Sequence, residues 1–290
     1  MNKNSYPKDF YLNIEKAVIA AIMAGKEIMD VYAQDFSSEI KDDGTPITIA
    51  DKKANDIIIN SLKQTELPII SEESRIAGFS EREKWNYYWL IDPIDGTKEF
   101  INKNDEFTVN IALMQKGNPL AGVIFAPALK QLYFGIINDG AYYFHYEKNI
   151  LNNKSFNLDY LVSNSKKLNP GSSSDKEFQI AVSRSHFNKQ TESFINYLKE
   201  NNKVELITAG SSLKFCRLSE GKCNLYPRFG KTFEWDIAAG HAILSACGGE
   251  VYSLSTKKPV VYNKSELENP FFIAFSKKEE SHSFFKNFSF

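Results

Sequence analysis

The sequence predicts an α/β fold, because segments with helical and with strand-like patterns both recur along its 290 residues. Three observations carry this prediction: an amphipathic segment near the N-terminus, a series of short β-rich segments in the middle, and alternating strand and helix patterns beyond residue 177. A chain of this length can bury a substantial core, as one large domain or as two modest ones.

Two helices are predicted in the first 62 residues. In the first helix, apolar residues with alanines between them recur near the helical period: Ile14, Val18, Ile22 and Met29. The second helix is predicted over residues 52–62, after a loop of turn-forming residues. We expect Asp51 to be the N-cap of this helix, because aspartate is favoured at that position.

Strands are predicted next, in short β-rich segments separated by turn residues such as Lys116, Gly117 and Asn118. The segments are residues 68–70, 87–91, 108–114, 121–126 and 131–136. Together with the two helices they predict one sheet with flanking helices.

A domain boundary is predicted in residues 151–177, which are rich in Asn, Ser and Lys and provide little material for a core. We therefore expect an N-terminal α/β domain of residues 1–155 and a C-terminal α/β domain of residues 156–290. In the second, strand patterns alternate with helix patterns. The strands are expected at residues 178–183 and 204–208, and the helices at residues 189–201, 212–220 and 237–246.

Composition excludes several classes of function. With 35 basic and 36 acidic residues the formal charge is -1, so we expect no binding to a nucleic acid polymer. The N-terminal region lacks an apolar run long enough for a signal peptide or a membrane span, so we expect a cytoplasmic protein without integral membrane association. Cys216, Cys223 and Cys247 form no CxxC pair, which argues against a disulfide framework or a structural zinc site.

An unusual acidic turn follows the strand predicted at residues 87–91, where Asp92 and Asp95 bracket Pro93. The proline fixes its own backbone angle, so both carboxylates can point toward one place at the carboxyl end of the strand, where α/β proteins tend to bind ligands. Hard divalent cations such as Mg²⁺ prefer oxygen ligands, and the carbonyl of Ile94 can be a further one. The alternative is that the two aspartates only stabilise the turn.

Further residues near the ends of predicted elements support a ligand site. Gly96 and Thr97 open a predicted helix whose free N–H groups suit a phosphate. Glu72 follows a short strand, whereas Asp236 and Asp51 lie at helix starts. Each acid alone has an ordinary explanation as a turn or cap residue. Acids at four such ends together favour a metal site.

These residues resemble the hallmarks of the inositol monophosphatase superfamily of Mg²⁺-dependent, lithium-inhibited phosphatases. The matching segments are TIAD at residues 48–51, EE at 72–73, DPIDGT at 92–97 and WDIAAG at 235–240. Because the matches span nearly the whole chain, the resemblance implies a two-domain layered αβαβα sandwich with the site between the domains.

The resemblance also implies a role for each acid. Two or three Mg²⁺ ions are held by five ligands: Glu72, Asp92, Asp95, Asp236 and the carbonyl of Ile94. The residues that match Asp51 and Thr97 activate the attacking water, with Asp51 accepting its proton through Thr97. No covalent phosphoenzyme is expected.

Within the superfamily, the second half of the chain is most similar to bacterial 3'(2'),5'-bisphosphate nucleotidases, which hydrolyse adenosine 3',5'-bisphosphate to AMP and phosphate. The similar segments include residues 183–186, 210–216 and 225–230. The substrate-binding residues that this similarity implies are Glu72, Ile94, Asp95, Gly96, Thr97, Ser183, Arg184, His186, Gly210, Ser211, Ser212, Lys214, Arg228 and Asp236. Hydroxyl groups, a helix start and basic side chains are what a second phosphate and a ribose need.

Two alternatives remain open at this point. The acids alone fit an inositol or sugar monophosphatase of the same superfamily equally well. A catalytically silent metal- or nucleotide-binding protein is a further alternative, although Asp51 and Thr97 argue against it. The sequence is compatible with a monomer or a homodimer.

Overall fold

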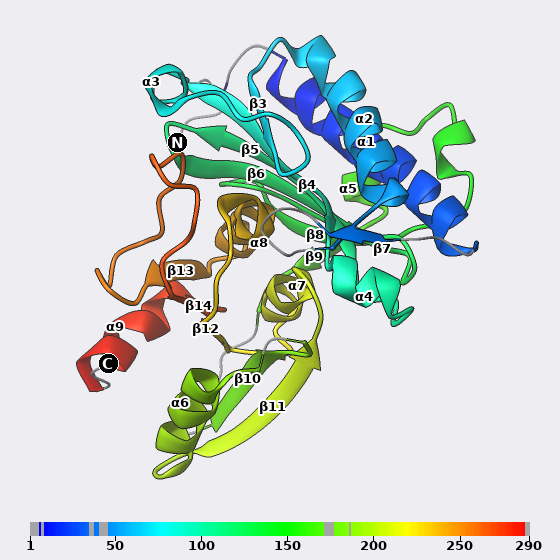
Figure 1. The fold of residues 1–290 in the computed structure, drawn as a ribbon. Helices are drawn as coiled ribbons and strands as arrows, with labels where there is room; N and C mark the ends of the chain where they lie inside the picture. The colour runs from blue at the N-terminus through cyan, green and yellow to red at the C-terminus, as the bar shows by residue number, and fades with distance from the viewer. Residues whose placement is uncertain are drawn as a thin grey trace.

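The computed structural model describes residues 6, 9–34, 38–40, 46–170, 177–185 and 187–287. In these residues helices and sheets alternate in five layers (Figure 1). Helices cover the outer face of each sheet, and a further helical layer separates the two large sheets. The layered αβαβα sandwich that the resemblance implies is therefore confirmed.

The helices of the described residues are α1 (Phe10–Tyr32), α2 (Ile49–Leu62), α3 (Phe79–Arg82), α4 (Thr97–Ile101), α5 (Leu158–Ser163), α6 (Lys189–Lys199), α7 (Leu213–Ser219), α8 (Glu234–Ala246) and α9 (Lys278–Asn287), with 3₁₀ turns η2 (Lys63–Thr65) and η3 (Ile150–Asn152). Of the helices in the described part of the chain, none combines the length and the apolar character needed to cross a membrane.

The first large sheet has seven strands in the order β3-β4-β5-β6-β7-β8-β9, of which β3 and β4 are parallel and the other neighbours antiparallel. Its strands are β3 (Ile69–Ser71), β4 (Tyr87–Asp95), β5 (Thr108–Gln115), β6 (Asn118–Ala126), β7 (Gln131–Ile136), β8 (Gly140–His145) and β9 (Lys166–Leu168). The second has the order β11-β10-β12-β14-β13. Its strands are β10 (Glu177–Ser183), β11 (Lys203–Ala209), β12 (Leu225–Arg228), β13 (Glu250–Ser253) and β14 (Phe272–Phe275). A separate pair joins β1 (Ser38–Ile40) to β2 (Pro46–Thr48).

Helices α1 and α2 cover one face of the seven-stranded sheet (Figure 1). The predicted apolar positions Ile14, Val18 and Ile22 of α1 are all buried in this interface. Both faces of the sheet are covered, because successive residues of β4 contribute to different cores. Trp89 packs on the side of α1 and α2, whereas Leu90 packs on the side of the middle helical layer. This explains why the predicted strands are continuous apolar runs rather than alternating ones.

Helix α8 of the middle layer packs directly on the seven-stranded sheet. A Cβ atom added to Gly122 of β6 would lie 2.3 Å from the carbonyl oxygen of Ala239 in α8. On the other side of the helix, a Cβ atom added to Gly240 would lie 2.5 Å from the ring of Phe215 in α7. Small residues on both sides therefore let the backbone of α8 fit between the sheet and α7.

The five-stranded sheet covers the other side of the middle layer. Ile180 and Val182 of β10 pack on the outer side, which α6 and α9 cover, and Ala181 packs toward α7 and α8. Strand β9 follows residue 155, yet it pairs with β8 and so extends the first sheet. The division into residues 1–155 and 156–290 stays a prediction.

We expect Gly122→Ala to lower the free energy of unfolding by about 1–3 kcal/mol, because the new methyl group overlaps the backbone of α8. Urea unfolding monitored by circular dichroism measures this change. Gly78→Ala is the matched control, since a Cβ atom at Gly78 meets no atom within 4 Å. Equal stability of the two variants would contradict the close packing of α8.

Candidate active site

The acidic turn after β4 lies where the pairing of β4 with β5 changes register. Asp92 pairs with Asn110 and Asp95 with Thr108, with an irregularity between the two aspartates. Pro93 lies in this irregularity, where its missing N–H breaks no regular ladder. The irregular end of the strand places both carboxylates at one edge of the sheet, as the sequence predicts.

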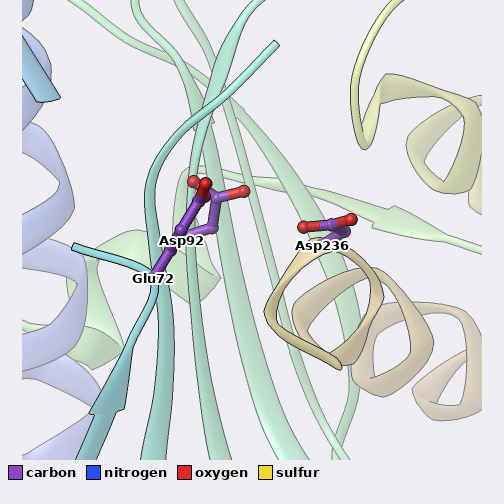
Figure 2. A group of neighbouring side chains, drawn as sticks. All are labelled: Glu72, Asp92 and Asp236. Atoms are coloured by element: carbon purple, nitrogen blue, oxygen red, sulfur yellow. The ribbon is translucent and has the colours of Figure 1, made fainter. Parts of the chain in front are cut away.

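Glu72 is placed beside Asp92 by the parallel pairing of β3 and β4. Ser71 is aligned with Ile91, and the N–H of Glu72 donates to the carbonyl of Ile91 at 3.2 Å. The residues that follow each strand therefore emerge side by side, and Figure 2 shows their two side chains next to each other.

Asp51 is not the N-cap of α2, contrary to the prediction. Thr48 is the N-cap, and Asp51 is the third residue of the helix. The N–H and the hydroxyl of Thr48 donate to Oδ2 of Asp51 at 2.7 and 2.6 Å, which is the geometry of a capping box. The other carboxylate oxygen, Oδ1, accepts from the hydroxyl of Thr97 at 3.3 Å. The predicted pair of Asp51 and Thr97 is therefore in contact.

Asp236 occupies the corresponding position in α8. This helix begins at Glu234, three residues earlier than predicted, and Asp236 is again the third residue. Its Oδ2 accepts from the N–H of Phe233, the N-cap, at 2.9 Å. The start of α8 thus fixes one oxygen of Asp236 and leaves the carboxylate at the end of the middle layer, opposite Glu72 and Asp92 (Figure 2).

Glu72, Asp92 and Asp236 form a carboxylate cluster. One oxygen from each lies within 4.8 Å of the others. Burial and the neighbouring carboxylates raise the pKa of Asp92 and of Asp236 well above the usual value. Oδ1 of Asp92 is buried without a hydrogen-bond partner. An unpartnered buried oxygen among three carboxylates fits a divalent cation that prefers oxygen ligands.

Asp95 and the carbonyl of Ile94 lie beside this cluster rather than within the group of three. Oδ2 of Asp95 accepts from the hydroxyl of Ser211 at 2.6 Å and from the amide of Asn110 at 3.4 Å. Burial raises the pKa of Asp95, although the Ser211 hydroxyl and the Lys214 ammonium oppose this. The carbonyl of Ile94 accepts from Thr97 at 3.3 Å.

The carboxylates open into a cavity of about 470 Å³ between the two large sheets. Most of the predicted site residues line it: Glu72, Asp92, Ile94, Asp95, Gly96, Thr97, Ser183, Ser211, Ser212, Lys214, Arg228 and Asp236. His186 lies outside the described residues. Four aromatic residues also line the cavity, namely Phe187, Phe215, Tyr226 and Phe233.

Arg184 and Gly210 do not line the cavity as predicted substrate-binding residues would. Both instead bond to Glu106, which the sequence analysis did not single out. The guanidinium of Arg184 donates to both carboxylate oxygens at 2.7 and 3.1 Å, and the N–H of Gly210 donates at 2.8 Å. Burial alone would raise the pKa of Glu106, but the Arg184 guanidinium lowers it. No sequence pattern marks Glu106, because its partners lie 78 and 104 residues away.

Two basic side chains line the cavity, of which Lys214 is buried and Arg228 half-buried. Burial lowers the pKa of Lys214 to about 8, although the Asp95 carboxylate opposes this shift. The Lys214 ammonium donates to the carbonyls of Ala209 and Ser211. Arg228 donates from Nη2 to the carbonyl of Lys231 at 3.2 Å, and its Nε is buried without a partner. A buried donor without an acceptor indicates an anionic ligand at this end of the cavity.

A hydroxyl network that the sequence analysis missed connects Asp95 to the second half of the chain. Thr108 Oγ1 lies 2.7 Å from the hydroxyl of Ser211 and 2.8 Å from that of Ser212. Oδ1 of Asn110 accepts from Ser212 at 2.8 Å. Ser211 has a φ of 49°, so these bonds hold it in a left-handed conformation. The available signal was two polar residues, Thr108 and Asn110, inside an apolar strand.

Comparison with known proteins shows the family to which the chain belongs. The model of the inositol monophosphatase family matches residues 12–283. The 3'(2'),5'-bisphosphate nucleotidase CysQ of Buchnera aphidicola subsp. Acyrthosiphon pisum is 42% identical over 257 residues, 84% of this chain and 89% of that protein. The CysQ nucleotidase of Salmonella typhimurium is 36% identical over 263 residues, 89% of this chain and 98% of its own length. The crystal structure of CysQ from Bacteroides thetaiotaomicron matches this structure with a TM-score of 0.83 and 42% sequence identity. The match covers 93% of this chain and 98% of the CysQ chain.

We expect Asp92→Asn to stabilise the metal-free protein at neutral and alkaline pH. The folded-state pKa of Asp92 is raised, so the stability that this group contributes is present below its unfolded-state pKa and is lost as the pH rises through the folded-state pKa. Without metal, the variant should have a higher free energy of unfolding than the wild type, and the difference should grow as the pH rises through the folded-state pKa of Asp92. Urea unfolding in a chelator, across a series of pH values, measures this difference.

The exposed Asp56→Asn on α2 is the control for Asp92→Asn and should leave the pH dependence unchanged. Adding Mg²⁺ should stabilise the wild type more than Asp92→Asn, because the variant has lost a ligand charge. Identical pH profiles for all three proteins would show that Asp92 carries no destabilising charge.

Proposed function

Because the chain belongs to the inositol monophosphatase family of metal-dependent phosphatases, we propose that it is a 3'(2'),5'-bisphosphate nucleotidase. In this proposal it hydrolyses the 3'-phosphate of adenosine 3',5'-bisphosphate to give AMP and phosphate. The observation that carries the proposal is that one cavity is lined both by the carboxylates and by the basic side chains of Lys214 and Arg228. Such a cavity suits a ligand with two phosphates, one of which is cleaved. The identity to curated nucleotidases supports the same substrate class.

Two or three Mg²⁺ ions are the proposed cofactor. Their ligands would be the carboxylates of Glu72, Asp92, Asp95 and Asp236 and the carbonyl of Ile94. When bound, Mg²⁺ neutralises the charge of the phosphoryl group and lowers the pKa of a water molecule. The carboxylates in turn fix where the scissile phosphate lies, since phosphoryl transfer depends chiefly on positioning and charge neutralisation.

Asp51 and Thr97 are the proposed pair that handles the proton of the attacking water. Oδ2 of Asp51 is fully used by the two bonds from Thr48, whereas Oδ1 faces the Thr97 hydroxyl. The Thr97 oxygen can therefore accept a proton from water while it passes its own proton to Oδ1. Asp51 ends the reaction protonated, and no covalent bond to the protein forms.

The second phosphate is proposed to bind at Arg228 and Lys214. The unpartnered Nε of Arg228 can donate to a phosphate oxygen, and the Lys214 ammonium gains a counter-charge there. Ser183 and the aromatic wall at Tyr226 and Phe233 leave room for the nucleoside between the two phosphates. Arg184 is not included in this set, because its Nε and Nη2 donate to the two carboxylate oxygens of Glu106.

The experiment that tests the function compares phosphate release from adenosine 3',5'-bisphosphate and from inositol 1-phosphate with Mg²⁺, with and without Li⁺. We expect a strong preference for the nucleotide and inhibition by Li⁺. Preference for the inositol phosphate would support the inositol monophosphatase alternative and overturn the role of Arg228. No release from either compound would favour the catalytically silent alternative.

We expect Thr97→Val to lower kcat for the bisphosphate about 100-fold, because the hydroxyl that carries the proton is lost. Thr97→Ser restores the hydroxyl and should recover most of the activity. Steady-state kinetics of both variants measure the effect. If Thr97→Val and Thr97→Ser were equally active, the proton path through Thr97 would be wrong.

We expect Arg228→Ala to raise KM for adenosine 3',5'-bisphosphate about tenfold and to change KM for adenosine 3'-monophosphate little, since the second substrate lacks the 5'-phosphate. The control is Arg75→Ala, which removes an exposed arginine outside the cavity lining. A similar increase in KM for both substrates would remove Arg228 from the binding site of the second phosphate.

A further inference from the structure

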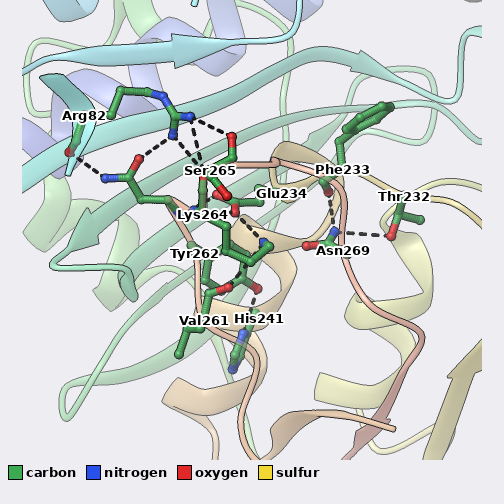
Figure 3. Close-up of polar contacts among 11 residues, drawn as sticks. Arg82, Thr232, Phe233, Glu234, His241, Val261, Tyr262, Lys264, Ser265 and Asn269 are labelled. Atoms are coloured by element: carbon green, nitrogen blue, oxygen red, sulfur yellow. Dashed lines mark hydrogen bonds and ion pairs between the residues drawn. The ribbon is translucent and has the colours of Figure 1, made fainter. Parts of the chain in front are cut away.

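A segment of the chain between β13 and β14, residues 261–269, runs along the start of α8; we call it the strap (Figure 3). Backbone hydrogen bonds fasten the strap to the residues just before and at the helix start. The N–H of Glu234 donates to the carbonyl of Leu267 at 2.9 Å, and the N–H of Asn269 donates to the carbonyl of Thr232 at 2.8 Å. The strap therefore contacts the turn from which Asp236 projects.

Asn269 makes the most direct contact between the strap and this turn. Its side-chain amide donates to the carbonyl of Phe233 at 2.5 Å and to the hydroxyl of Thr232 at 3.2 Å. Phe233 is also the residue whose N–H donates to Oδ2 of Asp236. One residue thus receives a hydrogen bond from Asn269 and gives one to the proposed metal ligand. Asn269 is itself buried, with 6% of its surface exposed.

A second contact is made by a residue of the helix itself: Glu234, in the first turn of α8, accepts hydrogen bonds from the strap (Figure 3). Its carboxylate is fully buried and accepts from the N–H groups of Asn263 and Lys264 at 2.6 and 3.1 Å, and from the Lys264 ammonium. A buried carboxylate needs several such partners. Glu234 does not line the cavity, so these bonds fix the backbone of the strap against the start of α8.

Arg82 joins the strap to the part of the chain that carries Glu72. It ends α3, which lies in the connection between β3 and β4, and its side chain is buried. The guanidinium donates to the side chain of Asn263 at 2.6 Å and to the carbonyls of Lys264 and Ser265 at 3.2 to 3.3 Å. The amide of Asn263 donates back to the carbonyl of Arg82 at 2.7 Å. The connection after Glu72 and the helix start before Asp236 are therefore held by the same segment.

We propose that the strap, through Asn269, Glu234 and Arg82, positions Asp236 relative to Glu72 and Asp92, and that it thereby sets the metal affinity of the site. These three residues are positioning residues, since they touch neither the substrate cavity nor the carboxylate cluster directly. The proposal rests on the proposed binding of metal by Asp236, but it is independent of the identity of the substrate.

The physical reason is the narrow range of distances in a metal site. A Mg²⁺ ion requires its oxygen ligands at about 2.0–2.1 Å, so a small displacement of one carboxylate weakens binding. Residues that orient the ligands of a metal typically change its affinity about 10- to 100-fold when they are replaced. Asn269 does not touch Asp236 directly. It bonds to Phe233, which in turn bonds to Asp236, so it is a residue that orients a proposed metal ligand.

The test is Asn269→Ala in the full chain, with metal binding measured by calorimetry using Mn²⁺ without nucleotide. We expect the dissociation constant for Mn²⁺ to rise about tenfold. The Mg²⁺ concentration for half-maximal phosphate release should rise by the same factor, whereas KM for the nucleotide at saturating Mg²⁺ should stay within about twofold. Because the calorimetric signal needs no turnover, it stands even if the substrate is another phosphate ester.

Asn224→Ala is the matched control. Asn224 is equally buried and also bonds to backbone groups, namely the N–H of Gln179 and the carbonyl of Glu177, but it lies away from α8. We expect this variant to lose stability without a change in Mn²⁺ affinity. Arg82→Lys is the second test variant, because an ammonium can replace only part of the guanidinium bonds, and it should weaken Mn²⁺ binding less than Asn269→Ala. If Asn269→Ala bound Mn²⁺ as tightly as Asn224→Ala does, the strap would have only a general structural role.

Discussion

The packing of α8 directly on the seven-stranded sheet is the constraint on which the site depends. Asp236 reaches Glu72 and Asp92 because the helix backbone lies against β6, and Gly122 leaves no side chain in between. A larger residue would move the helix start away from the ends of β3 and β4. The small residues at this interface therefore help to place Asp236, although they do not contact the carboxylates themselves. Gly240 has the same effect on the other side, where α7 packs against the helix.

Whereas the packing of α8 supports the site, the carboxylate cluster destabilises the fold that holds it. Asp92 is buried and Asp236 half-buried, both lie near Glu72, and desolvation together with the neighbouring carboxylates raises the pKa of each. A protein keeps such an arrangement only where the surrounding structure fixes it and a cation compensates the charge. The fixed elements are the strand register of β3 and β4 and the two helix starts. Asp51 and Asp236 both lie at the third position of a helix, where one carboxylate oxygen accepts from the N–H of the N-cap residue. The other oxygen of Asp51 accepts from Thr97.

The sequence predicts the parts of this site that depend on local order. Asp92 and Asp95 alone could be explained as turn residues, but acids at the ends of several other predicted elements made a common site recognisable. The prediction that Asp51 is the N-cap of α2 was wrong. Thr48 and Asp51 together form a capping box, in which the threonine is the N-cap and the aspartate is the third helical residue. Glu106 could not be found, because its role arises from bonds to residues 78 and 104 positions later in the chain. Such contacts follow from how the two sheets face each other, and periodicity contains no information about that arrangement.

Different structural elements supply the groups proposed for catalysis and those proposed for substrate recognition. The groups proposed to act on the scissile phosphate come from the ends of β3 and β4 and from the starts of α2, α4 and α8. The groups proposed to recognise the rest of the substrate, such as Lys214 and Arg228, belong to α7 and β12 on the other side. Contacts between these elements include the bond from Ser211 to the Asp95 carboxylate and the bond from Ser212 to Asn110. A change in Arg228 can therefore alter which phosphate ester is recognised while the carboxylate cluster stays in place. In this proposal the chemistry and the recognition are therefore built from different elements.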